Sequence, residues 1–296
     1  MTEREKDLFQ RSLLLLGPQA MQRLYCTRVI ILGVGGVGSW CAESLLRCGI
    51  HSLTLVDSDC VCSSNCNRQL MATTHTIGQP KVEALRERLL QINPDADITI
   101  LCQAYCQETA HEFGLENYDY VIDAIDSLAE KALLIRQVTA LTHSQKRPRL
   151  FSSMGAALRV DPTKVAVDEF WKVQGDPLAR SLRTKFRKEK QFPQSKFLCV
   201  YSQENPRKNL GASLLLATQP EEAAPLACQK SGKNAPTSSP QSEEAAPLAP
   251  QSTPDAAPKS YDWHDHKVQV NGSMCPITGI FGMTLAGLVL RDVCPD

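Results

Sequence analysis

Short apolar runs alternate with amphipathic stretches between residues 28 and 153, and this alternation constrains the fold more than any other feature. The runs are rich in β-branched side chains, as buried strands are, and the stretches between them place apolar residues at helical spacing. Such alternation predicts an α/β fold with a Rossmann-like, doubly wound and mainly parallel sheet. The expected elements are residues 28–33, 36–48, 53–57, 80–91, 98–101, 120–125, 128–142 and 149–153.

Composition divides the chain further. Residues 1–160 are expected to form a nucleotide-binding domain that includes an N-terminal helix, and residues 161–205 form a short basic segment. Residues 206–266 are rich in Pro, Ala, Ser, Gln and Glu, so they offer too little apolar surface to offset the entropy of ordering. We expect a disordered insertion there. Residues 267–296 are expected to form a strand and a helix. These make up a smaller C-terminal part that completes the fold.

Charge and cysteine content limit the class of function. The 32 Lys and Arg balance the 32 Asp and Glu, so contact with a polyanion requires a local basic patch. Several of the 12 Cys fall within expected helices or strands, which favours free thiols and, with no secretory signal recognisable, a cytoplasmic location. Residues 277–290 are apolar but shorter than the ~20 residues that span a bilayer. We expect a buried core helix and no stable membrane span; peripheral or single-pass membrane association is the less favoured alternative.

A glycine loop, GVGGVG, follows the first expected strand and opens the first helix. Gly33, Gly35, Gly36 and Gly38 would allow backbone N–H groups and the helix dipole to approach a phosphate. Asp57 ends the next strand, where a carboxylate can accept hydrogen bonds from ribose hydroxyls. This combination suits an NAD-binding protein and an ATP-binding protein equally well.

Polar residues farther along the chain favour adenylation. Asn65 and Arg68 lie in SSNCNRQ, Lys81 begins a helix after Gly-Gln-Pro, and Asp126 follows a strand. A carboxylate that attacks the α-phosphate of ATP builds negative charge on that phosphate and on the departing pyrophosphate, and cations stabilise this charge. A magnesium ion held by a carboxylate would do the same. The candidate catalytic residues are therefore Arg68, Lys81 and Asp126.

The motifs GVGGVG, LVDSD, NRQ, GQPK and DAID, with their spacing, resemble the nucleotide site of the adenylating superfamily that contains ThiF, MoeB and the ubiquitin-activating enzymes. The resemblance implies ATP and Mg²⁺ as cofactors, with room for a monovalent cation. Asp57 would bind the ribose and Asp126 the magnesium ion, whereas Asp123 is interpreted as a hydrogen-bonding residue at a strand end. The nucleotide-binding residues that the resemblance implies are Gly33, Gly35, Gly36, Gly38, Asp57, Asn65, Arg68, Lys81, Asp126, Ser127 and, from a partner subunit, Arg11.

Within that superfamily, the chain is most similar to the tRNA threonylcarbamoyladenosine dehydratases. The similar stretches are SWCAESLLRCGI, YVIDAIDSLAEKALLI, DPTKVAVDEFWKVQGDPLARSLRTKFRK and GIFGMTLAGLVL. The paired CxxC motifs of zinc-binding MoeB and ThiF proteins are missing, so zinc is not expected. This resemblance implies ATP-dependent dehydration of N6-threonylcarbamoyladenosine near the tRNA anticodon and a homodimer. A cysteine desulfurase or sulfur acceptor protein is a further partner to consider.

Residues 176–190 provide a candidate RNA contact. Leu178, Leu182 and Phe186 recur every four residues, which forms one apolar stripe if the segment is helical. The cations left on the remaining surface are expected to contact tRNA phosphates, although such runs are often only a solvated face. The predicted RNA-binding residues are Arg180, Arg183, Lys185, Arg187 and Lys188.

Two other functions stay open on the sequence. An activator of a sulfur-carrier or ubiquitin-like protein would use the same ATP-binding residues but would adenylate the C-terminus of a protein. An NAD-binding Rossmann oxidoreductase would share only the glycine loop and Asp57. Binding of ATP with magnesium, and not of NAD, would exclude the second alternative.

Overall fold

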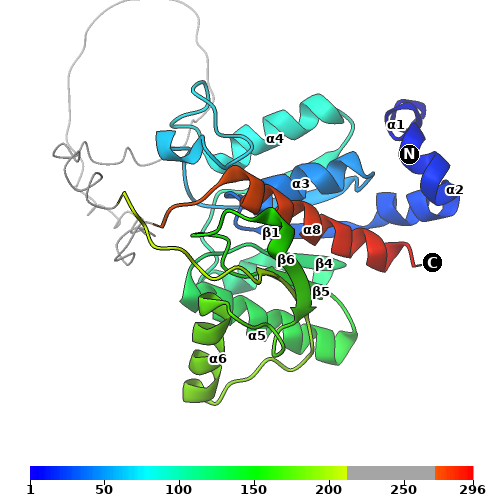
Figure 1. Ribbon diagram of the computed structural model, residues 1–296. Helices are drawn as coiled ribbons and strands as arrows, with labels where there is room; N and C mark the ends of the chain where they lie inside the picture. Colours follow the sequence, from blue (N-terminus) through cyan, green and yellow to red (C-terminus); the bar gives the residue numbers. More distant parts are fainter. Residues whose placement is uncertain (212–270, 296) are drawn as a thin grey trace, which may run out of the picture.

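The computed structural model describes residues 1–211 and 271–295, which form a sheet of seven strands covered by helices on both faces (Figure 1). The strand order is β3-β2-β1-β4-β5-β7-β6, and all neighbours are parallel except β6 and β7. The strands are β1 (Arg28–Leu32), β2 (Ser52–Val56), β3 (Asp97–Leu101), β4 (Tyr120–Asp123), β5 (Arg149–Ser153), β6 (Val165–Glu169) and β7 (Leu198–Ser202). This topology confirms the predicted doubly wound, mainly parallel α/β fold.

Each face of the sheet has its own core. Val29 and Ile31 of β1 point into the core beneath α3 (Gly38–Arg47), α4 (Lys81–Ile92) and α8 (Cys275–Val293). Ile30 and Leu32 point into the opposite core, beneath α5 (Leu128–Gln145) and α6 (Pro177–Glu189). Short 3-10 helices lie in the connections: η1 (Ser63–Asn65), η2 (Ala110–Phe113), η3 (Leu115–Asn117) and η4 (Pro162–Lys164).

Residues 161–205 contribute two strands to this same sheet and the helix α6 that packs on it, and the sequence pattern does not predict the two strands. β7 pairs with β5 in parallel, and β6 forms the edge of the sheet beside β7. β7 is a single short apolar run, and β6 is only partly buried along its length, so neither shows a clear strand period. Periodicity therefore does not predict either strand within this basic segment.

The apolar C-terminal helix is a core element, as predicted. By length and composition α8 could cross a membrane, but half of it is buried. It packs closely on the start of α3, because a Cβ at Gly282 would lie 2.5 Å from the carbonyl oxygen of Val37. The part of the predicted insertion from residue 212 onward, and the strand expected near 267–270, fall outside the described residues.

The N-terminal helices α1 (Glu3–Leu8) and α2 (Gln10–Cys26) lie by the amino ends of the strands. The buried Glu5 carboxylate is 2.9 Å from His51 Nδ1, just before β2, and accepts from the side chain of Asn93. α2 also meets the end of α8, where Arg23 donates to the carbonyl oxygen of Val293. The glycine loop lies at the opposite edge of the sheet, at the carboxyl ends of the strands.

Candidate nucleotide site

The glycine loop joins β1 to α3 and is held against the end of β4. Gly33 has a φ of 86°, and a Cβ there would lie 2.7 Å from the carbonyl oxygen of Ala124. A Cβ at Gly38 would lie 1.9 Å from the carbonyl oxygen of Gly33. Both positions therefore require glycine, and the loop opens where the strand order reverses between β1 and β4, the usual place for a ligand in such a sheet.

Asp57 follows β2 and fixes the glycine loop from the side. One carboxylate oxygen accepts from the Val34 N–H at 2.9 Å and the other from the Asp59 N–H at 3.0 Å. Burial raises the pKa of Asp57, and the Asp59 charge adds to this effect while Lys81 opposes it. The Asp57 side chain is thus held at the loop and remains about 10% exposed.

Lys81 is a buried cation at the start of α4. Its Nζ lies 2.6 Å from Asp59 Oδ2 and 3.7 Å from Asp57 Oδ1, and the residue is only 7% exposed. Burial acts to lower the pKa of Lys81, but the carboxylates of Asp57, Asp59 and Asp126 outweigh it and raise the pKa overall. Lys81 therefore keeps its charge at neutral pH, beside the loop where a phosphate would bind.

Asn65 ends the short helix η1, and Arg68 lies on the turn that follows it. Asn65 is buried, and its side-chain oxygen accepts from the Cys62 N–H at 3.1 Å. The Arg68 guanidinium donates to the Ser64 carbonyl at 2.8 Å and to the Asn67 side chain at 3.0 Å. Asn65 therefore shapes the turn, and Arg68 is held on it as a partly exposed cation.

Two contacts at the loop come from Gln69, which the SSNCNRQ stretch indicates without assigning it a role, and from Thr278, which no motif indicates. A Cβ at Gly36 would lie 3.1 Å from Thr278 Cγ2 of α8 and 3.5 Å from Arg68 Cγ. Gln69 is buried, its Oε1 has no hydrogen-bond partner among the described residues, and its Nε2 lies 3.7 Å from a Cβ built on Gly35. Thr278 is 210 residues away from Arg68, so no local motif could have indicated it.

The turn after β4 rests on a buried ion pair. Lys131 Nζ lies 2.8 Å from Asp123 Oδ2, and both side chains are fully buried. Lys131 also donates to the Ile125 carbonyl, while the Ile125 N–H donates to Asp123. Asp123 is thus a hydrogen-bonding residue at a strand end, and Asp126 is the exposed carboxylate of this turn.

Ser127 is the N-cap residue of α5, and its hydroxyl donates to Glu130. Arg11 is exposed on α2, by the opposite edge of the sheet. α8 contacts the glycine loop near Thr278 and α2 near Val293, and fifteen helical residues span about 22 Å. Among the described residues of a single chain, the Arg11 side chain has no hydrogen bond or ion pair with the glycine loop.

The residues present suit ATP better than a metal ion alone. The glycine loop, Asp57 and Lys81 offer N–H groups, a carboxylate and a cation at one edge of the sheet. Within residues 1–211 and 271–295, no group of three or more His, Cys, Asp or Glu side chains is placed to hold a metal. Asp126 could provide one ligand to Mg²⁺, which commonly takes its others from nucleotide phosphates and water.

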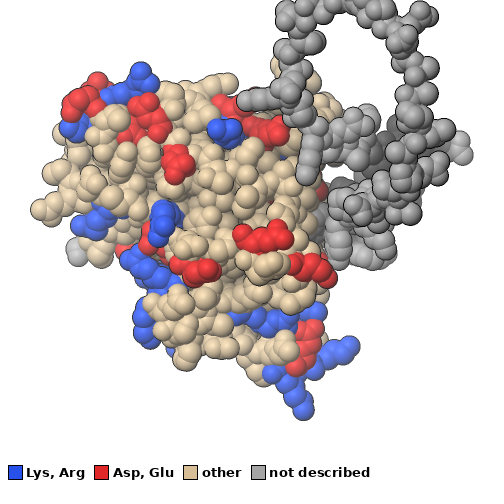
Figure 2. Space-filling view, turned by 180° about the vertical axis from the view of Figure 1, so that it is seen from behind, with Lys and Arg blue, Asp and Glu red and all other residues tan. Residues whose placement is uncertain are grey.

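Helix α6 holds the predicted RNA-binding cations, and the structure separates them into two groups. Arg183 donates to the carbonyl oxygens of Trp171 and Val173, and Lys185 pairs with Glu189 at 2.6 Å. The other predicted cations are exposed and have no side-chain partner within the described parts of the chain: Arg180, Arg187 and Lys188. Figure 2 shows Lys and Arg side chains at the lower end of the molecule, the end where Figure 1 places α6, with acidic side chains among them.

Comparisons with known proteins indicate the family and the fold. The model of the ThiF family matches residues 9–294. The tRNA threonylcarbamoyladenosine dehydratase of Bacillus subtilis (strain 168) is 41% identical over 181 residues, which are 61% of this chain and 69% of that protein. The molybdopterin-synthase adenylyltransferase of Escherichia coli (strain K12) is 31% identical over 63% of this chain and 71% of its own.

A solved structure extends the similarity to nearly the whole chain. The E. coli tRNA N6-threonylcarbamoyladenosine dehydratase TcdA in complex with AMP is 26% identical, with a TM-score of 0.72. The alignment covers 99% of this chain and 96% of that one. The same protein in complex with ATP gives a TM-score of 0.71.

Proposed function

The chain belongs to the ThiF family, and we propose that it uses ATP to dehydrate N6-threonylcarbamoyladenosine in tRNA to its cyclic form. The observation that carries the proposal is the buried cation Lys81, held between two carboxylates beside a glycine loop. The dehydratase of B. subtilis shares more identity with this chain than does the molybdopterin-synthase adenylyltransferase of E. coli. The substrate is therefore a carboxylate on tRNA and not the C-terminus of a carrier protein.

Each residue of the site has a distinct role in the proposed reaction. The glycine loop and Asp57 hold the nucleotide, and Arg68 and Lys81 stabilise the negative charge that develops when the substrate carboxylate attacks the α-phosphate. Asp126 would hold Mg²⁺, which neutralises charge on the phosphates. A nitrogen or oxygen of the same modification then attacks the adenylated carboxylate, which closes the ring, breaks the acyl–phosphate bond and releases AMP. Because this attack is intramolecular, no enzyme nucleophile is needed.

Mass spectrometry of the modified adenosine tests the proposal. tRNA that carries N6-threonylcarbamoyladenosine is incubated with the protein, ATP and Mg²⁺, and its nucleosides are then analysed. We expect loss of one water from the modified adenosine and release of pyrophosphate. Pyrophosphate exchange that depends on a carrier protein and not on tRNA would instead identify an activator of such a protein.

A homodimer is also part of the proposal, in which Arg11 of one subunit completes the ATP site of the other. Arg11 is exposed, and Leu14 and Leu15 beside it are 81% and 82% exposed, an apolar surface suited to a second subunit. The free thiols favour a cytoplasmic location, and the resemblance implies a monovalent cation and a sulfur-transfer partner.

Mixing two inactive variants checks the role of Arg11. Arg11→Ala and Lys81→Ala should each be inactive as homodimers, but a mixed dimer contains one site with both residues intact. We expect turnover to return toward about a quarter of wild type in an equal mixture, from random pairing of subunits. Mixed dimers that form, as native mass spectrometry would show, and yet stay inactive would contradict this role.

ATP binding should weaken on acidification because of Asp57. Its raised pKa means that it is protonated at a higher pH than an ordinary aspartate and then loses the charge that attracts ribose hydroxyls. Because the pKa of Asp57 is higher in the folded state, protonation of this group favours the folded state as the pH falls. Unfolding caused by Asp57 therefore cannot explain the loss of ATP binding. Titration calorimetry from neutral to acidic pH should show this loss in the wild type. Asp57→Asn should bind ATP more weakly at neutral pH and lack this acid-dependent loss.

A further inference from the structure

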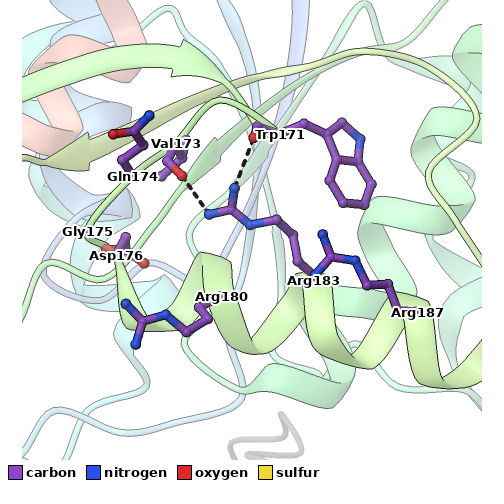
Figure 3. A pocket seen from close by; sticks show the side chains of 8 residues that line it. All are labelled: Trp171, Val173, Gln174, Gly175, Asp176, Arg180, Arg183 and Arg187. Atoms are coloured by element: carbon purple, nitrogen blue, oxygen red, sulfur yellow. Dashed lines mark hydrogen bonds between the residues drawn. The ribbon is translucent and has the colours of Figure 1, made fainter.

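A cavity of about 340 Å³ lies between α6 and the segment 171–176, on the side of the sheet away from α3 and α8 (Figure 3). Three arginines of α6 line one wall, and an exposed indole lies above them. The lining residues are Trp171, Val173, Gln174, Gly175, Asp176, Arg180, Arg183 and Arg187. No residue assigned to the ATP site lines this cavity.

Trp171 is a fixed aromatic surface at the cavity. Its ring is edge-on to the fully buried Phe170, with the centroids 5.2 Å apart, and the residue remains 38% exposed. Arg183 lies over the ring of Phe170 and donates to the carbonyl oxygens of Trp171 and Val173 at 3.0 and 2.6 Å. Arg183 thus holds the segment that carries the indole, so its own guanidinium is already occupied.

Arg180 and Arg187 supply the free positive charge. They lie three residues before and four residues after Arg183, on the same side of α6. Neither side chain has an ionic or hydrogen-bond partner in residues 1–211 and 271–295. Asp176 does not cancel them, because it is 1% exposed, pairs with Arg159 at 3.2 Å and caps α6.

The cavity is connected to the edge of the sheet that carries the ATP site. Asp176 Oδ2 accepts from the N–H of Gly155, two residues beyond the carboxyl end of β5. The glycine loop and Lys81 follow β1 and β2 at the same edge, on the other side of β4. An RNA that places its modified base in the ATP site could therefore extend along this edge to α6.

We propose that this cavity binds one unstacked nucleotide of the tRNA other than the adenosine that is modified. Its base stacks on Trp171, and its phosphates contact Arg180 and Arg187. Unstacked bases in RNA loops are commonly held by aromatic rings beside arginines, and stacking accepts any base. The proposal rests on the proposed tRNA substrate and assigns it a second point of attachment.

Paired variants distinguish binding of tRNA in this cavity from binding to a diffuse basic surface. Trp171→Ala should weaken binding of tRNA carrying N6-threonylcarbamoyladenosine about tenfold, and Trp171→Phe should recover most of that loss. Arg187→Gln should weaken binding several-fold and lower the log-log salt slope by about 0.7 to 0.9. Lys188→Gln, a loss of the same charge at the next residue but outside the cavity, should have a clearly smaller effect.

The readouts are tRNA affinity, KM and kcat for the modified tRNA, and ATP affinity. The cavity variants should raise KM with little change in kcat and none in ATP affinity, because the site binds tRNA away from the reacting atoms. Equal effects of Arg187→Gln and Lys188→Gln, or wild-type affinity in Trp171→Ala, would overturn the proposal even if the wild type converts its substrate. A wild type that binds tRNA but does not convert it would refute the proposed function and leave the cavity to be judged on affinity alone.

Discussion

Lys81→Ala is expected to lower turnover by about 100-fold or more, because it removes a cation that stabilises charge only as the α-phosphate is attacked. Nζ is within 4 Å of Asp57 and Asp59, and Asp57 accepts from the Val34 N–H of the glycine loop, so the amino group lies beside the loop. Its raised pKa keeps it charged throughout the neutral range. Turnover is measured as conversion of the modified adenosine by mass spectrometry and as release of pyrophosphate.

The fold must be intact for this result to be informative. Lys81→Ala leaves two carboxylates without their cation, so its melting temperature has to be compared with that of the wild type. Asp126→Ala offers an independent variant, because Asp126 is exposed and its loss should not disturb the core. A comparable fall in turnover is expected there, whereas Lys6→Ala, at an exposed ion pair, should behave as wild type. Near-normal turnover in both site variants would rule out charge stabilisation by these residues.

The site could be predicted from the sequence where local motifs define it. The glycine loop, Asp57 and Lys81 each lie at the end of a strand or the start of a helix, and parallel strands bring such positions to one edge. Thr278 could not be predicted, because a contact across 210 residues depends on how α8 packs on α3. The parallel strands of the sheet were likewise predictable. β6 and β7 were not, because neither strand shows a clear alternation of apolar and polar residues.

The sequence also cannot tell which charges are available to a ligand. Arg183 and Lys185 look equivalent to Arg187 in a basic helix, yet the first holds two backbone carbonyls and the second pairs with Glu189. The period of the apolar residues correctly places Leu182 and Phe186 in the core. It does not predict Trp171 opposite the helix, because that contact depends on the tertiary fold.

Lys131→Met is expected to lower the free energy of unfolding by about 3–5 kcal/mol, because it leaves Asp123 buried without its counter-ion. Both side chains of this pair are fully buried, so water cannot replace the lost partner. Ser152 and the Ile125 N–H still donate to Asp123, but neither supplies a charge. Urea unfolding followed by circular dichroism measures the loss, and the slope of the unfolding curve shows whether both proteins unfold as one cooperative unit.

Two further variants identify the cause of that loss. Asp123→Asn combined with Lys131→Met removes the buried charge but retains an acceptor for Ser152, so most of the lost stability should return. Lys185→Met, which breaks the partly exposed pair with Glu189, should cost less than about 1 kcal/mol. Turnover should fall even in the double variant, because Lys131 also holds the Ile125 carbonyl of the turn that positions Asp126. If the double variant is no more stable than Lys131→Met alone, the loss comes from packing or from the Ile125 contact and not from an unpaired charge.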